Sequence, residues 1–167
     1  MADSKTMANL ADAFAGESQA NRMYLAFAAK AEEDGYPLAA KRFRVAAASE
    51  TVHALNHFKN MGKVGSTADN LKAAMSGENY EHETMYPEFM ATAKAEGNED
   101  ARFSFYAANT AEKFHEAMFT EALENLANVP DKKFFVCQEC GMTYENEAPE
   151  LCVVCSFPRS QILEFVG

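Results

Sequence analysis

The sequence predicts an all-α four-helix bundle followed by a small metal-binding β module, and three observations support this prediction. Residues 3 to about 127 are rich in Ala, Glu, Lys, Met and Leu, which favour helices, and breaker-rich segments divide them into four. The two halves of this helical stretch resemble each other. All four cysteines follow it, between residues 137 and 155. We therefore expect a bundle domain over residues 1–130 and a separate cysteine module over residues 131–167.

Breaker residues mark the ends of the expected helices. Gly, Pro, Asn and Asp concentrate at residues 32–37, 60–70 and 96–100, and Pro130 ends the last helix. After Pro130 the helical pattern stops, and β-forming stretches such as KKFFVC and QILEFV appear. The expected helices are therefore 4–33, 38–61, 70–95 and 99–127.

Composition and charge exclude several classes of partner. Of the 167 residues 48% are hydrophobic, so the chain can bury a core and is not expected to be disordered. A formal net charge of −10 argues against nucleic acid and anionic membrane surfaces as partners. No apolar run approaches the roughly 20 residues that a membrane span needs. No secretory signal is visible at the N-terminus, so we expect a cytoplasmic protein.

The helical part contains an internal repeat. A shift of 62 positions aligns a second helical hairpin with the first, and each copy ends in Glu-x-x-His. Two copies are too few for a solenoid, and they fit a bundle built from two hairpins. The matching positions are Met23 and Met85, Tyr24 and Tyr86, Phe27 and Phe89, Phe43 and Phe105, Glu50 and Glu112, and His53 and His115.

Each Glu-x-x-His motif places a carboxylate and an imidazole on one helix face. Glu50 and His53 are three residues apart, and so are Glu112 and His115. Positions i and i+3 of a helix share a face, so the two side chains of each pair can reach one point. This arrangement is typical of a metal site.

Apolar residues accompany the first motif. Val45, Val52 and Leu55 fall near the helix face that carries Glu50, which is an unusual setting for a solvated carboxylate. A buried carboxylate needs a partner, and a metal ion is the strongest one available. We therefore expect Glu50 to be buried and bound to metal.

Carboxylates on the other two helices lie at the same level of the bundle. Glu17 precedes the first interhelical turn by about as many residues as Glu50 follows it, and Glu78 and Glu81 have the same relation to Glu112. One Glu from each of two helices, plus Glu-x-x-His from each of the others, is the pattern of dinuclear sites in ferritin-like proteins. Carboxylates with imidazoles suit iron or manganese. The expected ligands of the two metal ions are Glu17, Glu50, His53, Glu78, Glu81, Glu112 and His115.

Four further side chains near this level admit two interpretations. Tyr24 and Tyr86 follow the predicted glutamate ligands of their helices by about two turns, so each phenol could hydrogen-bond a ligand carboxylate or belong to the ordinary core. His57, one turn beyond the first motif, could lie beside the ligands, but we favour a helix histidine outside the site. His82 is expected at the surface or beside the ligands.

The cysteines form two Cys-x-x-Cys knuckles separated by eleven residues. This spacing is a strong signature of one metal ion held by four thiolates, and a reducing compartment favours metal ligation over disulfides. The metal is either structural zinc or iron that transfers single electrons, and spacing does not choose between them. The expected ligands are Cys137, Cys140, Cys152 and Cys155.

Together these motifs resemble the rubrerythrin family over nearly the whole chain. The resemblance lies in the segments GESQANRMY, SETVH, GENYEHETMYPEF, AEKFH and CQECG…APELCVVC. It implies a ferritin-like di-iron bundle fused to a rubredoxin-like Fe(Cys)4 domain. It also implies that His53 and Glu81 exchange at one iron as its oxidation state changes, and that the other iron ligands are Glu17, Glu50, Glu78, Glu112 and His115.

One position departs from the family pattern. Gly141 follows the first knuckle, but Ser156 stands where rubredoxin-like sites usually have a second glycine. If the backbone there has a positive φ, serine costs about 1 kcal/mol relative to glycine.

The resemblance implies an enzyme that reduces hydrogen peroxide to water. Electrons would come from a reduced donor protein, such as rubredoxin or a reductase, and enter through the Fe(Cys)4 centre. The alternative is a ferritin-like ferroxidase or iron-storage protein whose cysteine module holds structural zinc. A third hypothesis, a purely structural metal-binding interaction module, leaves the carboxylates unexplained.

The connection between the two hairpins predicts a dimer. Helices of about 25 residues are roughly 37 Å long, whereas the eight residues 62–69 reach at most roughly 28 Å. Either the bundle is a simple up-down-up-down arrangement, or two chains exchange hairpins, and we favour a helix-swapped homodimer. Each site would then combine Glu17, Glu50 and His53 of one chain with Glu78, Glu81, Glu112 and His115 of the other.

Overall fold

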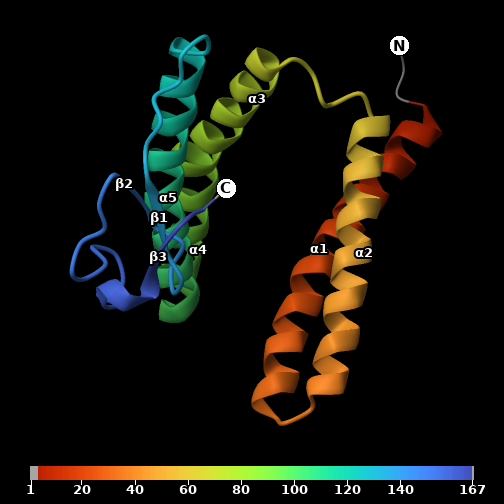
Figure 1. The fold of residues 1–167 in the computed structure, drawn as a ribbon, viewed down its shortest axis with the longest axis horizontal. Helices are drawn as coiled ribbons and strands as arrows, with labels where there is room; N and C mark the ends of the chain where they lie inside the picture. The colour runs from red at the N-terminus through yellow and green to blue at the C-terminus, as the bar shows by residue number, and fades with distance from the viewer. Residues whose placement is uncertain (1–3, 167) are drawn as a thin grey trace. The chain divides into compact units, whose positions relative to one another are not determined.

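The structure is a computed structural model that describes residues 4–166, and it divides into two compact units, Met1–Gly65 and Ser66–Gly167. The first unit is a helical hairpin, and the second joins another helical hairpin to a three-stranded sheet (Figure 1). The predicted mostly helical fold with a small C-terminal β module is therefore confirmed. Within the described residues, no helix is both long enough and apolar enough to cross a membrane.

The first unit pairs α1 (Lys5–Glu33) with α2 (Pro37–Asn60). Ser4 begins α1 by accepting a hydrogen bond from the amide of Met7 at 3.3 Å, and Pro37 begins α2, where its fixed φ suits the first turn. Small residues let the two helices approach closely, and their buried alanines are Ala28, Ala40, Ala47 and Ala54.

The second unit contains one interrupted helix and one continuous helix. The expected helix 70–95 is observed as α3 (Thr67–Tyr80), a π-helical turn η1 (Glu81–Met85) and α4 (Tyr86–Glu96). Gly97, with φ of 70°, ends α4, and the Asn98 side chain caps α5 (Glu99–Glu124). Uninterrupted helical periodicity between 70 and 95 was therefore a wrong expectation at η1, where one turn is wider.

The predicted repeat has a structural counterpart in two equivalent aromatic clusters. In the first unit the ring of Phe27 lies 5.6 Å from that of Phe43, and in the second Phe89 lies 5.4 Å from Phe105. Tyr24 and Tyr86 complete the clusters, with ring centroids 6.3 Å from Phe43 and Phe105 respectively. The two hairpins are thus packed in the same way.

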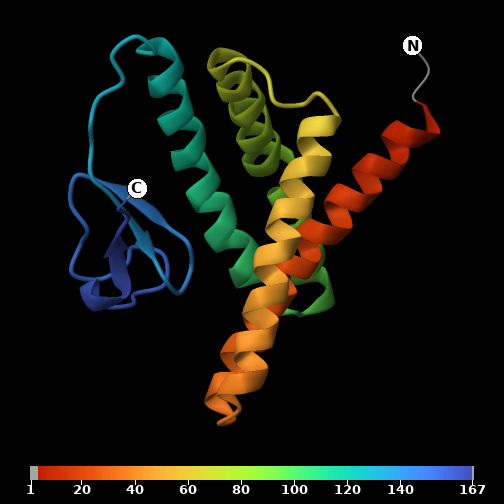
Figure 2. The same cartoon turned by 45° about the vertical axis from the view of Figure 1, so that its right-hand side comes forward.

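The cysteine module is an antiparallel sheet with strand order β2-β1-β3, beside α5 of its own chain (Figure 2). The strands are β1 (Phe134–Cys137), β2 (Thr143–Glu145) and β3 (Ile162–Glu164), with a 3-10 turn η2 (Arg159–Gln161) before β3. Its small core consists of Phe135, Cys137, Cys152 and Ile162.

Candidate metal centres

The first hairpin brings together three predicted ligands, Glu17 on α1 with Glu50 and His53 on α2. Their ligand atoms lie within 4.8 Å of one another. Nδ1 of His53 is 2.9 Å from Oε2 of Glu50 and 3.7 Å from Oε1 of Glu17. A hydrogen bond between the two carboxyl groups raises the pKa of Glu17, while the same bond and the bond to His53 lower the pKa of Glu50.

The second hairpin repeats this arrangement with Glu78, Glu112 and His115. Nδ1 of His115 is 2.6 Å from Oε2 of Glu112 and 3.7 Å from Oε2 of Glu78. Burial, followed by the hydrogen bond to Glu112, raises the pKa of Glu78 to about 7. Burial opposes the ionisation of Glu112, but the hydrogen bond to His115 keeps its pKa below the ordinary value, and the same bond raises the pKa of His115.

Glu81 lies on the π-helical turn, outside the three-residue cluster of its hairpin. Burial and the negative charge of Glu112 raise the pKa of Glu81, so the Glu81 carboxyl group lies within electrostatic range of the cluster. Single π-helical turns are rare and are frequently found at functional sites. The turn therefore gives this predicted ligand a backbone setting that its helix does not have elsewhere.

The repeat contains a signal for this turn that periodicity alone misses. Glu78 follows Glu17 by 61 positions, as Gly77 follows Gly16, whereas Met85 follows Met23 by 62 positions. The second copy therefore holds one extra residue between Glu78 and Met85, where η1 lies. An inserted residue that widens one turn is the usual origin of a π-bulge.

His82 is buried, with 7% of its side chain exposed, so of the two expected places, at the surface or beside the ligands, the surface is wrong. Its Nε2 lies 2.6 Å from Oε2 of Glu116 on α5, and Asn79 donates to Oε1 of the same carboxylate at 3.1 Å. Nδ1 of His82 is 3.1 Å from Oε1 of Glu83 but has no hydrogen-bond geometry to it. Sequence reasoning missed Glu116, because its spacing from other carboxylates suggests no ligand motif.

The remaining predicted polar residues lie near the clusters without contacting them. Among the described residues, neither Tyr24 nor Tyr86 makes a hydrogen bond through its hydroxyl to a predicted ligand. Burial, and then the charges of Glu112, Glu81 and Glu78, raise the pKa of Tyr86, which places its phenol within their electrostatic reach. His57 makes no contact with the Glu17–Glu50–His53 cluster and acts on Glu17 only through its charge.

The apolar residues that accompany Glu50 are exposed, contrary to the sequence expectation. The Glu50 side chain is 19% exposed, but Val45, Val52 and Leu55 are 64%, 56% and 63% exposed. The reason is that α1 covers only the alanine-rich face of α2. A row of large apolar side chains on α2 therefore stays exposed next to the ligand candidates.

The four cysteines gather at one point of the module, as predicted. Sγ of Cys137 is 3.6 Å from Sγ of Cys155, and Sγ of Cys140 is 3.5 Å from Sγ of Cys152. Four thiolates about 2.3 Å from one tetrahedral ion have sulfurs roughly 3.8 Å apart, so the spacing fits a single iron or zinc ion. The donor set therefore matches the metal that the motif predicts.

Hydrogen bonds favour the thiolate form of one cysteine. Burial opposes ionisation of Cys152, but the hydroxyl of Tyr144, which donates to its Sγ at 3.1 Å, and backbone amides lower its pKa to about 6. Ser156 has φ of 61°, so the positive φ considered for this position is observed. Gly141, its counterpart after the first knuckle, has φ of 78°.

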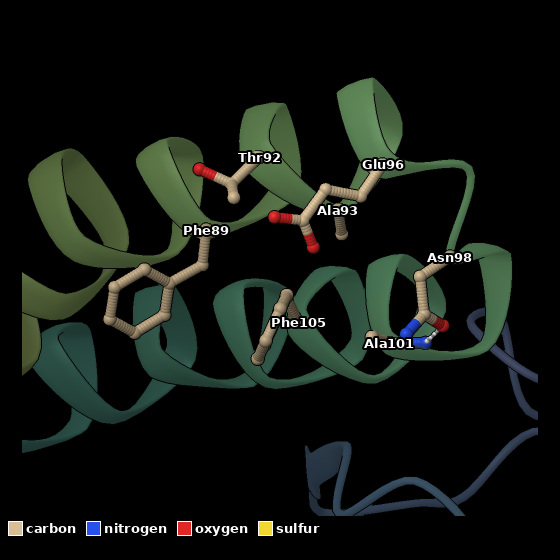
Figure 3. A pocket seen from close by; sticks show the side chains of 7 residues that line it. All are labelled: Phe89, Thr92, Ala93, Glu96, Asn98, Ala101 and Phe105. Carbon is tan, nitrogen blue, oxygen red and sulfur yellow. Dashed lines mark hydrogen bonds between the residues drawn. The ribbon is translucent and has the colours of Figure 1, made fainter.

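A cavity of about 450 Å³ lies between α4 and α5, near the turn that joins them (Figure 3). Its lining contains Phe89 of α4, Phe105 of α5 and one carboxylate, Glu96. No predicted metal ligand lines it, since Phe105 is two helical turns from Glu112. The cavity therefore takes no part in the candidate metal sites.

Comparison with known proteins agrees with this combination of sites. The profile of the rubrerythrin family matches residues 8–123. Rubrerythrin-2 of Clostridium acetobutylicum is 34% identical, covering 93% of this chain and 94% of that protein. Rubrerythrin of Nitratidesulfovibrio vulgaris is also 34% identical, covering 98% and 95% respectively. A solved structure of fully reduced, all-ferrous nigerythrin has a TM-score of 0.57 at 32% identity and covers 99% of this chain and 91% of that one. The chain belongs to the rubrerythrin family.

Proposed function

We propose that this protein is a non-haem di-iron peroxidase that reduces hydrogen peroxide to water. Membership of the rubrerythrin family supports a di-iron protein linked to oxidative stress. The observation that carries the proposal is the pair of equivalent Glu–Glu–His clusters, one per hairpin, in the same chain as a four-cysteine site. Neither a simple storage bundle nor a zinc ribbon accounts for both.

The donor atoms of the clusters fit iron. Each cluster offers carboxylate oxygens and one imidazole nitrogen, which suits Fe²⁺ and Fe³⁺ better than copper or a soft metal. We infer that the residues holding the two irons are Glu17, Glu50, His53, Glu78, Glu81, Glu112 and His115. Two bound ferrous ions would supply one electron each to the O–O bond of peroxide, which with two protons becomes two water molecules.

The polypeptide contributes charge compensation around this chemistry. The pKa of Glu78 is raised to about 7, so this carboxyl group keeps its proton below neutral pH, whereas the hydrogen bond to His115 favours the ionised form of Glu112. Glu81 lies on the wider π-helical turn, and we infer that this turn lets its carboxylate and His53 exchange as ligands. Burial, and then the charges of these carboxylates, raise the pKa of Tyr86, so its phenol stays protonated beside the ligands.

We propose that residues 1–130 form the di-iron domain and that residues 131–167 deliver electrons to it through one iron in the four-cysteine site. The electron donor would be a reduced protein such as rubredoxin or a reductase. A thiolate site suits a reducing compartment, so we place the reaction in the cytoplasm. Zinc in place of iron would preserve the fold of the module but would abolish electron delivery.

Stopped-flow oxidation of the anaerobically reduced, iron-loaded protein tests this function. We expect hydrogen peroxide to oxidise the bundle irons faster than dioxygen at equal concentration. Equal or faster oxidation by dioxygen would favour the alternative, a ferroxidase. A cysteine module that remains colourless and contains only zinc after expression with ample iron would contradict its role in electron delivery.

A further inference from the structure

Thr143 connects the cysteine module to the candidate ligand His115. It is the first residue of β2, is 6% exposed, and its Oγ1 lies 3.1 Å from Nε2 of His115 on α5. The same hydroxyl donates to the carbonyl oxygen of Gly141 at 3.4 Å. Because its proton points to that carbonyl, the hydroxyl oxygen can accept the Nε2–H of His115.

This hydrogen bond determines which imidazole nitrogen is available to a metal. With the proton on Nε2, the lone pair of the neutral ring is on Nδ1. Nδ1 is the nitrogen that faces the carboxylates, 2.6 Å from Glu112 and 3.7 Å from Glu78. Thr143 thus holds the ring of His115 in the orientation that metal binding requires, and it keeps the proton on Nε2 when a metal ion replaces the proton that Nδ1 shares with Glu112.

The equivalent histidine of the first hairpin has no such support. Among the residues that the structure describes, Nε2 of His53 has no hydrogen-bond partner. The His53 side chain is 50% exposed, whereas that of His115 is 27% exposed. The cysteine module therefore distinguishes two otherwise equivalent motifs.

The module is held against α5 by a second contact. Nζ of Lys132 bridges Glu121 on α5, at 2.7 Å, and Glu145 on β2, at 2.8 Å. The Lys132 side chain is only 19% exposed, so this bridge is partly shielded from solvent. It positions the strand that begins with Thr143 beside the helix that carries His115.

The fold of the module depends on its own metal. Two of the four residues in its buried core are the metal-ligand candidates Cys137 and Cys152. A core this small gains most of its stability from a bound ion, and without the ion the strands lose their fixed positions. Loss of the ion would therefore release Thr143 from His115.

We propose that Thr143 is a positioning residue for His115, and that metal in the cysteine module thereby strengthens metal binding by the Glu78–Glu112–His115 cluster. This proposal rests on the proposed function, because it takes His115 as a ligand. It adds a coupling between the two kinds of metal site, with the Thr143–His115 hydrogen bond as the connection.

The test is a Co²⁺ titration of the full chain whose cysteine module holds one equivalent of Zn²⁺, followed by visible absorption. Thr143→Val keeps the shape of the side chain and removes the hydroxyl. We expect this variant to bind Co²⁺ in the bundle about 10- to 100-fold more weakly, with a changed absorption spectrum. Thr143→Ser restores the hydroxyl and should bind within about twofold of the wild type.

Thr120→Val is the matched control, because Thr120 is a part-buried threonine of α5 that donates only to a backbone carbonyl. It should bind Co²⁺ like the wild type. Nitrogen-15 NMR of His115 with Zn²⁺ bound in both the module and the bundle provides an independent measurement. The Nε2–H resonance should be observed in the wild type and should be lost to exchange with solvent in Thr143→Val.

The coupling is tested by removing the module's own metal. Cys140→Ser combined with Cys155→Ser should abolish Zn²⁺ binding there and weaken Co²⁺ binding in the bundle as much as Thr143→Val does. Wild-type Co²⁺ affinity in this variant would disprove the coupling, and wild-type affinity and spectrum in Thr143→Val would disprove the positioning role. A wild-type bundle that takes up no Co²⁺ would instead contradict the proposed function itself.

Discussion

Nε2 of His82 lies 2.6 Å from Oε2 of Glu116, a contact that joins the π-helical turn η1 to α5. The hydrogen bond lowers the pKa of Glu116, so the carboxylate accepts from the imidazole. Asn79, one residue before the end of α3, donates to the other oxygen of this carboxylate. Glu116 therefore fixes both ends of the short segment that contains Glu81.

Replacing His82 should destabilise this segment. His82→Ala removes a buried ring and a hydrogen bond to a charged group, so we expect the free energy of unfolding to fall by about 2 kcal/mol. Urea denaturation of the metal-free protein measures this change. His57→Ala, which removes a part-exposed histidine of α2, is the control and should leave the midpoint almost unchanged. Equal effects of the two substitutions would show that the contact with Glu116 contributes nothing specific.

Residue spacing along single helices predicted which ligand candidates lie together, whereas contacts between helices account for the residues that it missed. Glu50 with His53, and Glu112 with His115, meet because positions i and i+3 share a helix face. His82 and Glu116 are 34 positions apart, so no helical spacing relates them. Helical periodicity did not predict the π-helical turn. The sequence does contain a signal for it, because the offset between the two repeats changes from 61 positions at Glu78 to 62 at Met85.

The sequence also did not predict which apolar side chains of α2 are exposed. An apolar neighbour on a helix face predicts burial only if a second element covers that face, and Val52 on α2 has no such cover within its hairpin. Side-chain type alone cannot report which of two apolar faces the partner helix uses. In α2 that face is the alanine-rich one, as the complete burial of Ala40 shows.

Glu112→Ala should remove metal from the bundle. Glu112 contacts His115 at 2.6 Å and shares a hydrogen bond with Glu78, so its loss disrupts the whole cluster of the second hairpin. We expect the iron content of the bundle to fall well below that of the wild type, while the visible absorption of the cysteine module persists. Metal analysis with absorption spectroscopy measures both. A full iron complement in this variant would show that the site lies elsewhere.

The metal-free protein should lose stability as pH rises towards neutrality. The pKa of Glu78 increases from 4.5 to about 7 on folding, so between these values the folded state keeps a proton that the unfolded state releases. The free energy of unfolding therefore falls as pH rises through this window, and the loss is complete above about 7. Urea denaturation in the presence of chelator, repeated across this range, measures the slope.

Glu78→Gln mimics the protonated carboxyl group and should flatten this pH dependence. Glu88→Gln, at an exposed position of α4, is the control and should keep the wild-type slope. An unchanged slope in Glu78→Gln would assign the effect to another group. In the wild type, metal binding near pH 6 should also release a proton from Glu78, which a weakly buffered indicator assay detects.

Ser156→Gly should stabilise the cysteine module. Ser156 adopts φ of 61°, where a side chain is strained and glycine is not, so the substitution should contribute at most about 1 kcal/mol. The rate at which a chelator extracts metal from the four-cysteine site should decrease. Gly141→Ala is the reciprocal control, because φ is 78° there and an added Cβ meets no atom within 4 Å. It should accelerate extraction through backbone strain alone.

The short connection between the two hairpins predicts how the protein assembles. Helix α2 ends at Asn60 and α3 begins at Thr67, which leaves residues 61–66 as the connector. Six residues span at most roughly 22 Å, whereas the 24 residues of α2 extend about 36 Å. A connector of this length cannot return along the bundle, and large apolar side chains on α2 remain exposed. We therefore propose a homodimer in which two chains exchange hairpins.

Co-expression of Glu50→Ala and Glu112→Ala chains tests this exchange. In a swapped heterodimer one site carries both lesions and the other carries none, so the heterodimer isolated from the co-expressed chains should have about half of the bundle iron and peroxidase activity of the wild type. Without exchange, each chain keeps its own lesion in its own site, and nothing is recovered. The matched control pairs Glu50→Ala with Glu17→Ala, whose lesions lie in the same hairpin, so every site stays damaged in either arrangement. Recovery by the first pair alone supports exchange, and recovery by neither pair rules it out.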